Sequence, residues 1–87
     1  MILTVNYSSF FHRRYKQLTE KQKADFKKAI QLFVENPFHS KLKTHKLKGK
    51  WGDYWSFSIN YSDRVLFKFS DQETIDLINI GDHSIYR

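Results

Sequence analysis

Apolar and polar residues follow one another along this chain with a period that changes from strand-like to helix-like and back. Residues 2 to 7 alternate as a half-buried β-strand does. Two stretches after them repeat their apolar residues every three or four positions, which is the spacing of one helix face. The period of two then returns in residues 54 to 61, 64 to 69 and 74 to 81. The pattern predicts a strand, a helical hairpin and a run of consecutive strands.

Both helices carry signals for their ends. Ser8 or Ser9 can cap the first helix, and Thr19 with Gln22 has the spacing of a capping box at the start of the second. Pro37 ends the second helix, because the residue before a proline avoids the helical region. The apolar positions of the two helices are Phe11, Tyr15 and Leu18, then Phe26, Ala29, Ile30 and Phe33.

A basic connector with a short strand around residues 43 to 48 precedes the longer strands, and Gly49 and Gly52 allow a turn between them. Alternation predicts which residues share a face. Trp55, Phe57, Ile59 and Tyr61 should lie on one side of their strand. The helices should cover Trp55, Phe57, Val65 and Phe67, which leaves a more polar face near Ser56, Ser58, Asn60 and Arg64. We therefore expect one α+β domain of residues 1 to 87, in which the N-terminal strand and helical hairpin pack on one face of a largely antiparallel twisted sheet.

The charge of the chain indicates which kinds of partner it can bind. Fifteen Lys and Arg against nine Asp and Glu give a formal net charge of +6, spread along the whole sequence. This favours an anionic partner such as nucleic acid, the ribosome or an acidic protein, although a soluble basic domain without such a partner has the same charge. The absence of cysteine excludes disulfides, thiolate chemistry and cysteine zinc sites. With no long apolar run, we expect a cytoplasmic protein that does not enter membranes.

The order of the strands brings distant polar residues to one edge of the sheet. In an antiparallel meander, Arg64 and His83 meet at the same edge. If the short basic strand pairs with the strand after it, His45 returns to within on the order of 10 Å of that edge. The expected site also includes the phenol of Tyr86 and a cationic rim formed by Lys43, Lys46, Lys48 and Lys50, with Trp51 beside it.

Two imidazoles, a guanidinium, a phenol and a ring of ammonium groups suit the cleavage of RNA at its own 2′-hydroxyl. One group removes the 2′ proton, another protonates the leaving 5′ oxygen, and the cations stabilise the charge on the phosphate. Histidine populates both protonation states near neutral pH. This chemistry requires neither a metal nor a cofactor.

Each of these residues also has a plainer interpretation. A histidine in a lysine-rich loop is usually a solvated side chain, which applies to His12, to His39 and, on local sequence alone, to His45. His83 could be a structural histidine after a strand end, and Trp51 could pack in the sheet instead of stacking on a nucleobase. The spacing of His45, Asp82 and His83 is not a recognised zinc pattern.

Three segments carry a resemblance to a known family: "HKLKG", "YWSFSINYSDRVLF" and "IGDHSIY". With them, nearly the whole chain resembles the RelE/ParE toxin superfamily and, within it, the YafQ-like (RelE/StbE type) branch of type II toxin-antitoxin systems. The resemblance implies a ribosome-dependent mRNA endoribonuclease, or mRNA interferase, that is neutralised by an acidic antitoxin.

The resemblance also implies roles for individual residues. His45 matches the histidine before the L-x-G segment, and His83 matches the C-terminal catalytic histidine. Tyr86 lies near the aromatic position that closes the motif, one residue earlier than in some relatives. Arg64 corresponds to a phosphate-contacting arginine.

The sequence departs from the family pattern at two strand positions and one turn position. Ser58 stands where YafQ-type enzymes carry a histidine, and Ser56 stands where they carry an aspartate. A further family acid matches Asp63 only with a shift of one residue, because direct alignment places Ser62 there. The acid-base set is therefore smaller than in that branch.

Two other functions remain open at this point. A ParE-like inhibitor of DNA gyrase would share the fold and would not need His45, Arg64 and His83. A catalytically silent relative would bind the antitoxin without arresting growth. The three hypotheses differ in whether the histidines are needed and whether mRNA is cut.

Overall fold

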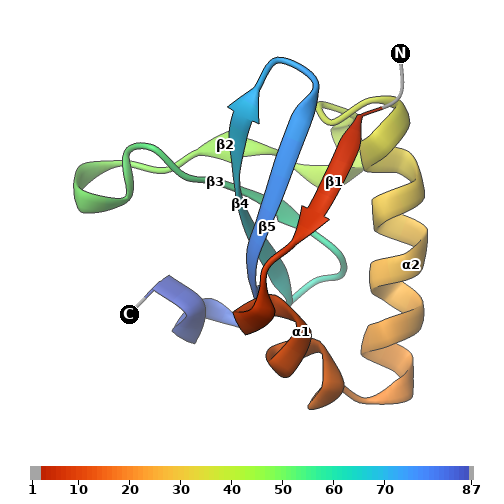
Figure 1. The fold of residues 1–87 in the computed structure, drawn as a ribbon. Coiled ribbons are helices and arrows are strands. Elements are labelled where there is room, and N and C mark those ends of the chain that lie inside the picture. The colour runs from red at the N-terminus through yellow and green to blue at the C-terminus, as the bar shows by residue number, and fades with distance from the viewer. Residues whose placement is uncertain (1–2, 87) are drawn as a thin grey trace.

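The computed structural model describes residues 3 to 86, and Figure 1 shows the arrangement of the elements. In chain order they are β1 (Thr4–Tyr7), α1 (Ser9–Lys16), α2 (Glu20–Glu35), η1 (Ser40–Leu42), β2 (His45–Lys46), η2 (Gly49–Trp51), β3 (Trp55–Ser58), β4 (Arg64–Asp71), β5 (Thr74–Gly81) and η3 (His83–Tyr86), where η marks a 3₁₀ helix. The sheet has the order β1-β5-β4-β3-β2, and only the β1–β5 pair is parallel. The expected α+β fold with a largely antiparallel sheet is confirmed.

The helix ends lie where the sequence predicts them. The Ser8 hydroxyl oxygen accepts the Phe11 backbone N–H at 3.0 Å and caps α1. At the start of α2, the Thr19 hydroxyl accepts the Gln22 N–H at 3.1 Å, while the Gln22 side-chain oxygen accepts the Thr19 N–H at 2.8 Å. Asn36, before Pro37, adopts an extended conformation with φ −153° and ψ 95°, so α2 ends one residue earlier.

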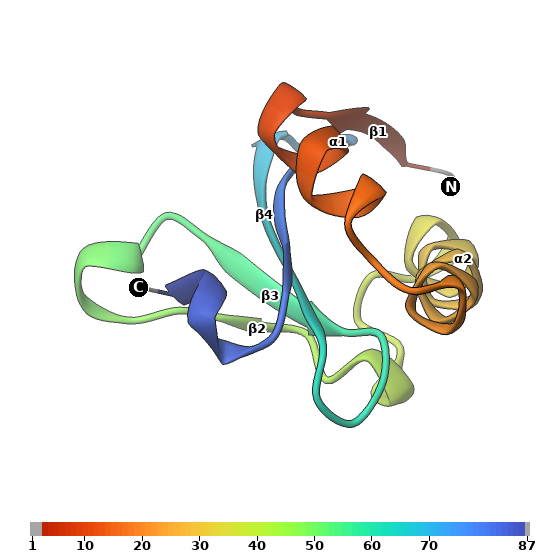
Figure 2. The same cartoon turned by 90° about the horizontal axis from the view of Figure 1, so that it is seen from below.

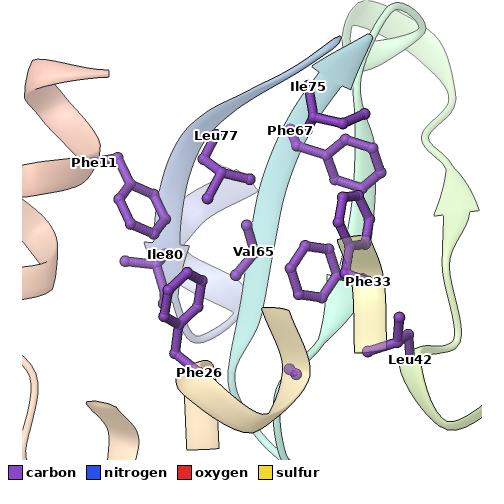
Figure 3. Packing of buried hydrophobic residues seen from close by; sticks show 11 residues of the cluster. Phe11, Phe26, Phe33, Leu42, Val65, Phe67, Ile75, Leu77 and Ile80 are labelled. Carbon is purple, nitrogen blue, oxygen red and sulfur yellow. The ribbon is translucent and has the colours of Figure 1, made fainter. Parts of the chain in front are cut away.

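The core lies between α2 and the sheet, with α1 closing one end. The Phe33 ring stacks on Phe57 with their centroids 4.4 Å apart and meets the edge of Phe67 at 5.0 Å. Figure 3 shows the Phe33 and Phe67 rings among the side chains of β4 and β5. The buried cluster consists of Phe11, Phe26, Ala29, Phe33, Leu42, Phe57, Val65, Phe67, Ile75, Leu77 and Ile80. Burial of each large side chain favours folding by roughly 1.5 to 3 kcal/mol, so this cluster is the main support of the sheet.

The face of the sheet away from the helices is less polar than expected. Figure 2 shows η3 on the opposite side of β4 and β5 from α2. Leu66 and Ile85 are 2% and 4% exposed, and Ser56, expected on an open polar face, is completely buried. The C-terminal segment folds back over this face, which strand alternation alone does not reveal.

Strand β3 is also shorter than expected. It ends at Ser58, because the Asn60 side-chain oxygen accepts the backbone N–H groups of Ser62 and Asp63 and turns the chain there. Tyr61, predicted to share the buried face, is 97% exposed on this turn, so that prediction is wrong. The expected start of the first strand at Ile2 lies outside the described residues.

Candidate functional site

The short β2–β3 hairpin fixes the position of His45. In the antiparallel register His45 lies opposite Ser56, on the face away from the helices. Its Nδ1 atom is 3.0 Å from the backbone carbonyl oxygen of Lys43. A carbonyl oxygen only accepts hydrogen bonds, so Nδ1 is the donor, and in the tautomer that this bond selects the lone pair lies on Nε2. His45 is exposed, so this nitrogen is accessible to a substrate.

Lys43 owes the direction of that carbonyl to an unusual backbone conformation. It ends η1 with φ 53° and ψ 38°, in the left-handed region. Among residues 3 to 86 it is the only residue other than glycine with a positive φ. A side chain in this region costs on the order of 1 kcal/mol, which the surrounding structure must offset. The strained residue therefore lies close to His45, and its carbonyl oxygen orients the imidazole.

Tyr86 joins the C-terminal segment to the same hairpin. Its hydroxyl oxygen is 2.6 Å from the hydroxyl oxygen of Ser56, and its backbone carbonyl accepts the indole N–H of Trp51 at 3.0 Å. Cross-strand neighbours such as Ser56 and His45 have Cβ atoms roughly 5 Å apart, so the phenol lies beside the imidazole. His83 is exposed, and its ring meets the Tyr86 ring edge-on at 6.2 Å. Ser56 thus lies beside His45 and contacts Tyr86, and Tyr86 in turn contacts His83.

Arg64 lies at the same end of the sheet, as the meander predicts. It faces Ser58 on β3 and Gly81 on β5, one side-chain level beyond Ser56. Its Nη1 atom donates to the carbonyl oxygens of Asn60 at 3.0 Å and Asp63 at 2.9 Å. Among the residues that the structure describes, Nη2 and Nε have no hydrogen-bond acceptor, so these N–H groups are available to an anion.

A polar network holds the turn from which Arg64 projects. The Asn60 amide nitrogen donates to both Asp25 and Asp63, at 2.9 Å each, and Gln22 donates to Asp63 at 3.2 Å. The hydrogen bond from Asn60 is the largest cause that lowers the pKa of Asp25 below its ordinary value, followed by that from Lys21. Asp63 is buried and has two donors, so it supports the turn and does not project toward the imidazoles.

The predicted cationic rim divides between two faces. Lys46 lies opposite Trp55, so its side chain begins on the face opposite to that of His45. Lys48 precedes η2, and the Lys50 ammonium lies 5.8 Å from the centre of the Trp51 ring. Trp51 is half-buried and engaged with the C-terminal segment, which corresponds to the packing interpretation of this residue.

A pocket of about 210 Å³ opens beside Arg64, at the end of β3. Its cationic side chains come from Arg64, Lys41 and Lys43, and Tyr61 lines it as well. Lys41 and Tyr61 are not among the site residues that the sequence predicts. The sequence signals that could have identified them are the turn-forming Asn60 and the basic loop before β2, but their proximity depends on the packing of η1 against β3. Within residues 3 to 86, no three His, Asp or Glu side chains are arranged to bind a metal ion.

Ser56 and Ser58, the two strand positions at which the sequence departs from the family pattern, have different surroundings. Ser56 is fully buried under the Tyr86 hydroxyl. Ser58, by contrast, is half-buried and lines the pocket beside Arg64. Of the acid-base groups expected in the site, His45 and His83 are exposed and Tyr86 is half-buried.

Comparisons with known proteins agree with this architecture. The family model described as "Bacterial toxin of type II toxin-antitoxin system, YafQ" matches residues 3–86. No curated protein sequence matches the chain. Residues 3 to 86 contain no helix that is long and apolar enough to cross a membrane.

Solved structures share the fold at low sequence identity. YafQ from E. coli strain BL21(DE3) matches with a TM-score of 0.79 and 17% identity over 97% of both chains. A chain of the E. coli DinJ-YafQ toxin-antitoxin complex matches with a TM-score of 0.77 and 17% identity, over 98% of this chain and 97% of that one. The YoeB dimer from Staphylococcus aureus matches with a TM-score of 0.75 and 22% identity, over 95% of this chain and 99% of that one.

Proposed function

The chain belongs to the YafQ family of bacterial toxins of type II toxin-antitoxin systems, and we propose from this premise that it is a metal-independent endoribonuclease that cleaves mRNA on the ribosome. The observation that supports the reaction is the chain of neighbours that runs from His45 through Ser56 and Tyr86 to His83. Two imidazoles and a phenol are thus neighbours, and Arg64, with free N–H groups, lies one side-chain level beyond Ser56. Residues 1 to 87 act as one toxin domain in the cytoplasm.

In this mechanism His45 is the general base. Its Nδ1–H is held by the Lys43 carbonyl, so Nε2 accepts the proton from the 2′-hydroxyl of the RNA. The 2′ oxygen forms a bond to phosphorus, and the bond from phosphorus to the 5′ oxygen breaks. His83, in its protonated form, gives a proton to that leaving oxygen. The products are a 2′,3′-cyclic phosphate and a 5′-hydroxyl.

The cations and the phenol assist that step. Arg64 and Lys43 stabilise the charge on the phosphate, because both line the pocket at the end of β3. Tyr86 is fixed by Ser56 and donates to a phosphate oxygen or to the leaving oxygen. Lys48 and Lys50 bind the RNA backbone farther along the hairpin, and Trp51 holds the C-terminal segment in place.

The partner that restrains this activity is an acidic antitoxin. The DinJ-YafQ structure is a toxin-antitoxin complex, and the net charge of +6 on this chain favours an acidic segment. Such a segment covers the basic face and orders as it binds.

The test is primer extension on a defined mRNA in a purified translation reaction. Wild type, His83→Ala and a reaction without ribosomes are compared. We expect cleavage only with wild type and ribosomes. Intact mRNA in every lane, from a protein that still arrests growth, would refute the nuclease and point to a bound target such as DNA gyrase.

A further inference from the structure

Two neighbouring hollows on the surface form one groove that leads away from the candidate site. The pocket beside Arg64 and a second pocket of about 160 Å³ are both lined by Lys41, Ser58 and Ile59. The second pocket extends to α2, where Lys28 and Asp25 line it. Because the two hollows share a wall, the groove runs from Arg64 past Lys41 to the surface of α2.

The charge of the groove is positive along its length. Its cationic side chains are Arg64, Lys43, Lys41 and Lys28. The acidic side chain that lines it, Asp25, accepts hydrogen bonds from Lys21 at 3.1 Å and from Asn60 at 2.9 Å, so much of its charge is compensated. The negatively charged backbone of an RNA strand is a ligand of complementary charge.

An aromatic ring stands at the entrance of this groove. Tyr61 lines the first pocket, and its side chain is 97% exposed. The turn beneath it is ordered: Asn60 accepts the N–H groups of Ser62 at 2.9 Å and Asp63 at 2.7 Å, and Ile59 donates to the Asp63 carbonyl at 3.1 Å. The ring is thus presented to solvent by a well-connected backbone and contributes nothing to the core.

We propose that this groove binds the single-stranded mRNA next to the cleaved phosphate, with a flanking nucleobase stacked on Tyr61 and the phosphate of that nucleotide held by Lys41. An aromatic ring beside a cationic track is the combination by which proteins hold unpaired nucleotides. The groove begins at Arg64, which the proposed reaction places on the cleaved phosphate, so a substrate strand bound there continues into the groove. This inference rests on the proposed function.

The experiment measures ribosome-dependent cleavage over a range of toxin concentrations. Wild type, Tyr61→Ala, Tyr61→Phe and Phe10→Ala are compared. Phe10 is the matched control, because it is an exposed ring with the Arg13 guanidinium 5.6 Å from its centre, but it lies on α1 and does not line the groove. Thermal unfolding of each variant confirms that it is folded.

We expect Tyr61→Ala to raise the toxin concentration for half-maximal cleavage between about fivefold and 100-fold, which is the range of one base-aromatic stack. The rate at saturation should stay the same. Tyr61→Phe keeps the ring and should behave as wild type, and so should Phe10→Ala. Equal curves for wild type and Tyr61→Ala would overturn the inference while leaving the nuclease in place. A wild type that cuts no mRNA would instead overturn the proposed function, and the inference with it.

A second measurement identifies the stacked base. Single abasic nucleotides are introduced at each position flanking the cleavage site. We expect one of them to reproduce the defect of Tyr61→Ala and to add no further defect in that variant, because both changes remove the same contact. If every abasic position adds its full defect to that of Tyr61→Ala, the ring contacts the ribosome instead of the substrate, and the inference is wrong.

Discussion

The Tyr86 hydroxyl and the Ser56 hydroxyl share a hydrogen bond of 2.6 Å that joins the C-terminal segment to the centre of the sheet. Ser56 is buried, and its cross-strand neighbour is His45. The bond therefore sets where the phenol stands relative to the imidazole. It also explains how a segment only a few residues long after β5 reaches the residues of a hairpin 30 positions earlier.

Removing the phenol hydroxyl should affect both stability and cleavage. Tyr86→Phe leaves the Ser56 hydroxyl buried without its partner, which costs about 1 to 3 kcal/mol of unfolding free energy. Ser56→Ala removes the buried hydroxyl and keeps the phenol, which is only half-buried and can turn to water. Urea denaturation should show the larger loss for Tyr86→Phe. Equal stability of Tyr86→Phe and wild type would show that the bond does not hold the segment.

His45→Ala should separate catalysis from folding. The side chain is exposed, so its removal should change the unfolding free energy by less than about 0.5 kcal/mol. Cleavage should fall by about 10²- to 10⁴-fold, because the general base is lost. His12→Ala, an exposed histidine on α1, is the control and should cleave as wild type does. Similar rates for both variants would exclude His45 as the base.

Asn60→Ala should weaken the turn that positions Arg64. Two backbone N–H groups lose their acceptor and two carboxylates lose their donor, which should lower the unfolding free energy by about 2 to 3 kcal/mol. Cleavage should also fall, because Arg64 donates to the backbone carbonyl of Asn60, and the position of that carbonyl depends on the turn. Ser62→Ala, at an exposed position in the same turn, should change the unfolding free energy by less than about 0.5 kcal/mol. Equal stability of the two variants would contradict this account of the turn.

Acid should weaken the link between α2 and that turn. The folded state lowers the pKa of Asp25 below its ordinary value of 3.8, chiefly through the hydrogen bond from Asn60. The carboxylate therefore adds stability that is complete above about pH 5 and is lost as the pH falls through the lowered pKa. Asp25→Asn should be less stable than wild type at pH 7, and the difference should shrink below about pH 4. Urea denaturation from pH 2 to 7 measures it, and a constant difference would contradict the link.

Much of the fold follows from local signals in the sequence. Thr19, Gln22 and Pro37 define α2 because capping and proline geometry act within a few residues. The alternation in β3 and β4 identifies Phe57, Val65 and Phe67 as buried for the same reason, since strand neighbours point to opposite faces. These features do not depend on distant parts of the chain.

The features that were missed depend on tertiary contacts. Strand alternation predicts that Ser56 is a surface residue, but Tyr86 covers it in the folded chain. Alternation also predicts that Tyr61 is a core residue, but the Asn60 side chain forms a turn that ends the strand before it. Lys46 and His45 are adjacent in a basic run, yet the register with β3 places them on opposite faces. The candidate residues and their shared edge could therefore be predicted from the sequence, while the face on which each side chain lies required the structure.

The most direct test of the account uses one altered atom in the substrate. The 2′-hydroxyl at the cleavage site of an mRNA is replaced by hydrogen, and both mRNAs are incubated with the toxin in a purified translation reaction. The account predicts that only the unmodified mRNA is cut and that the fragment upstream of the cut ends in a 2′,3′-cyclic phosphate, because the 2′ oxygen is the nucleophile that His45 activates. Equal cleavage of both mRNAs would contradict this, as would an unmodified mRNA that stays intact.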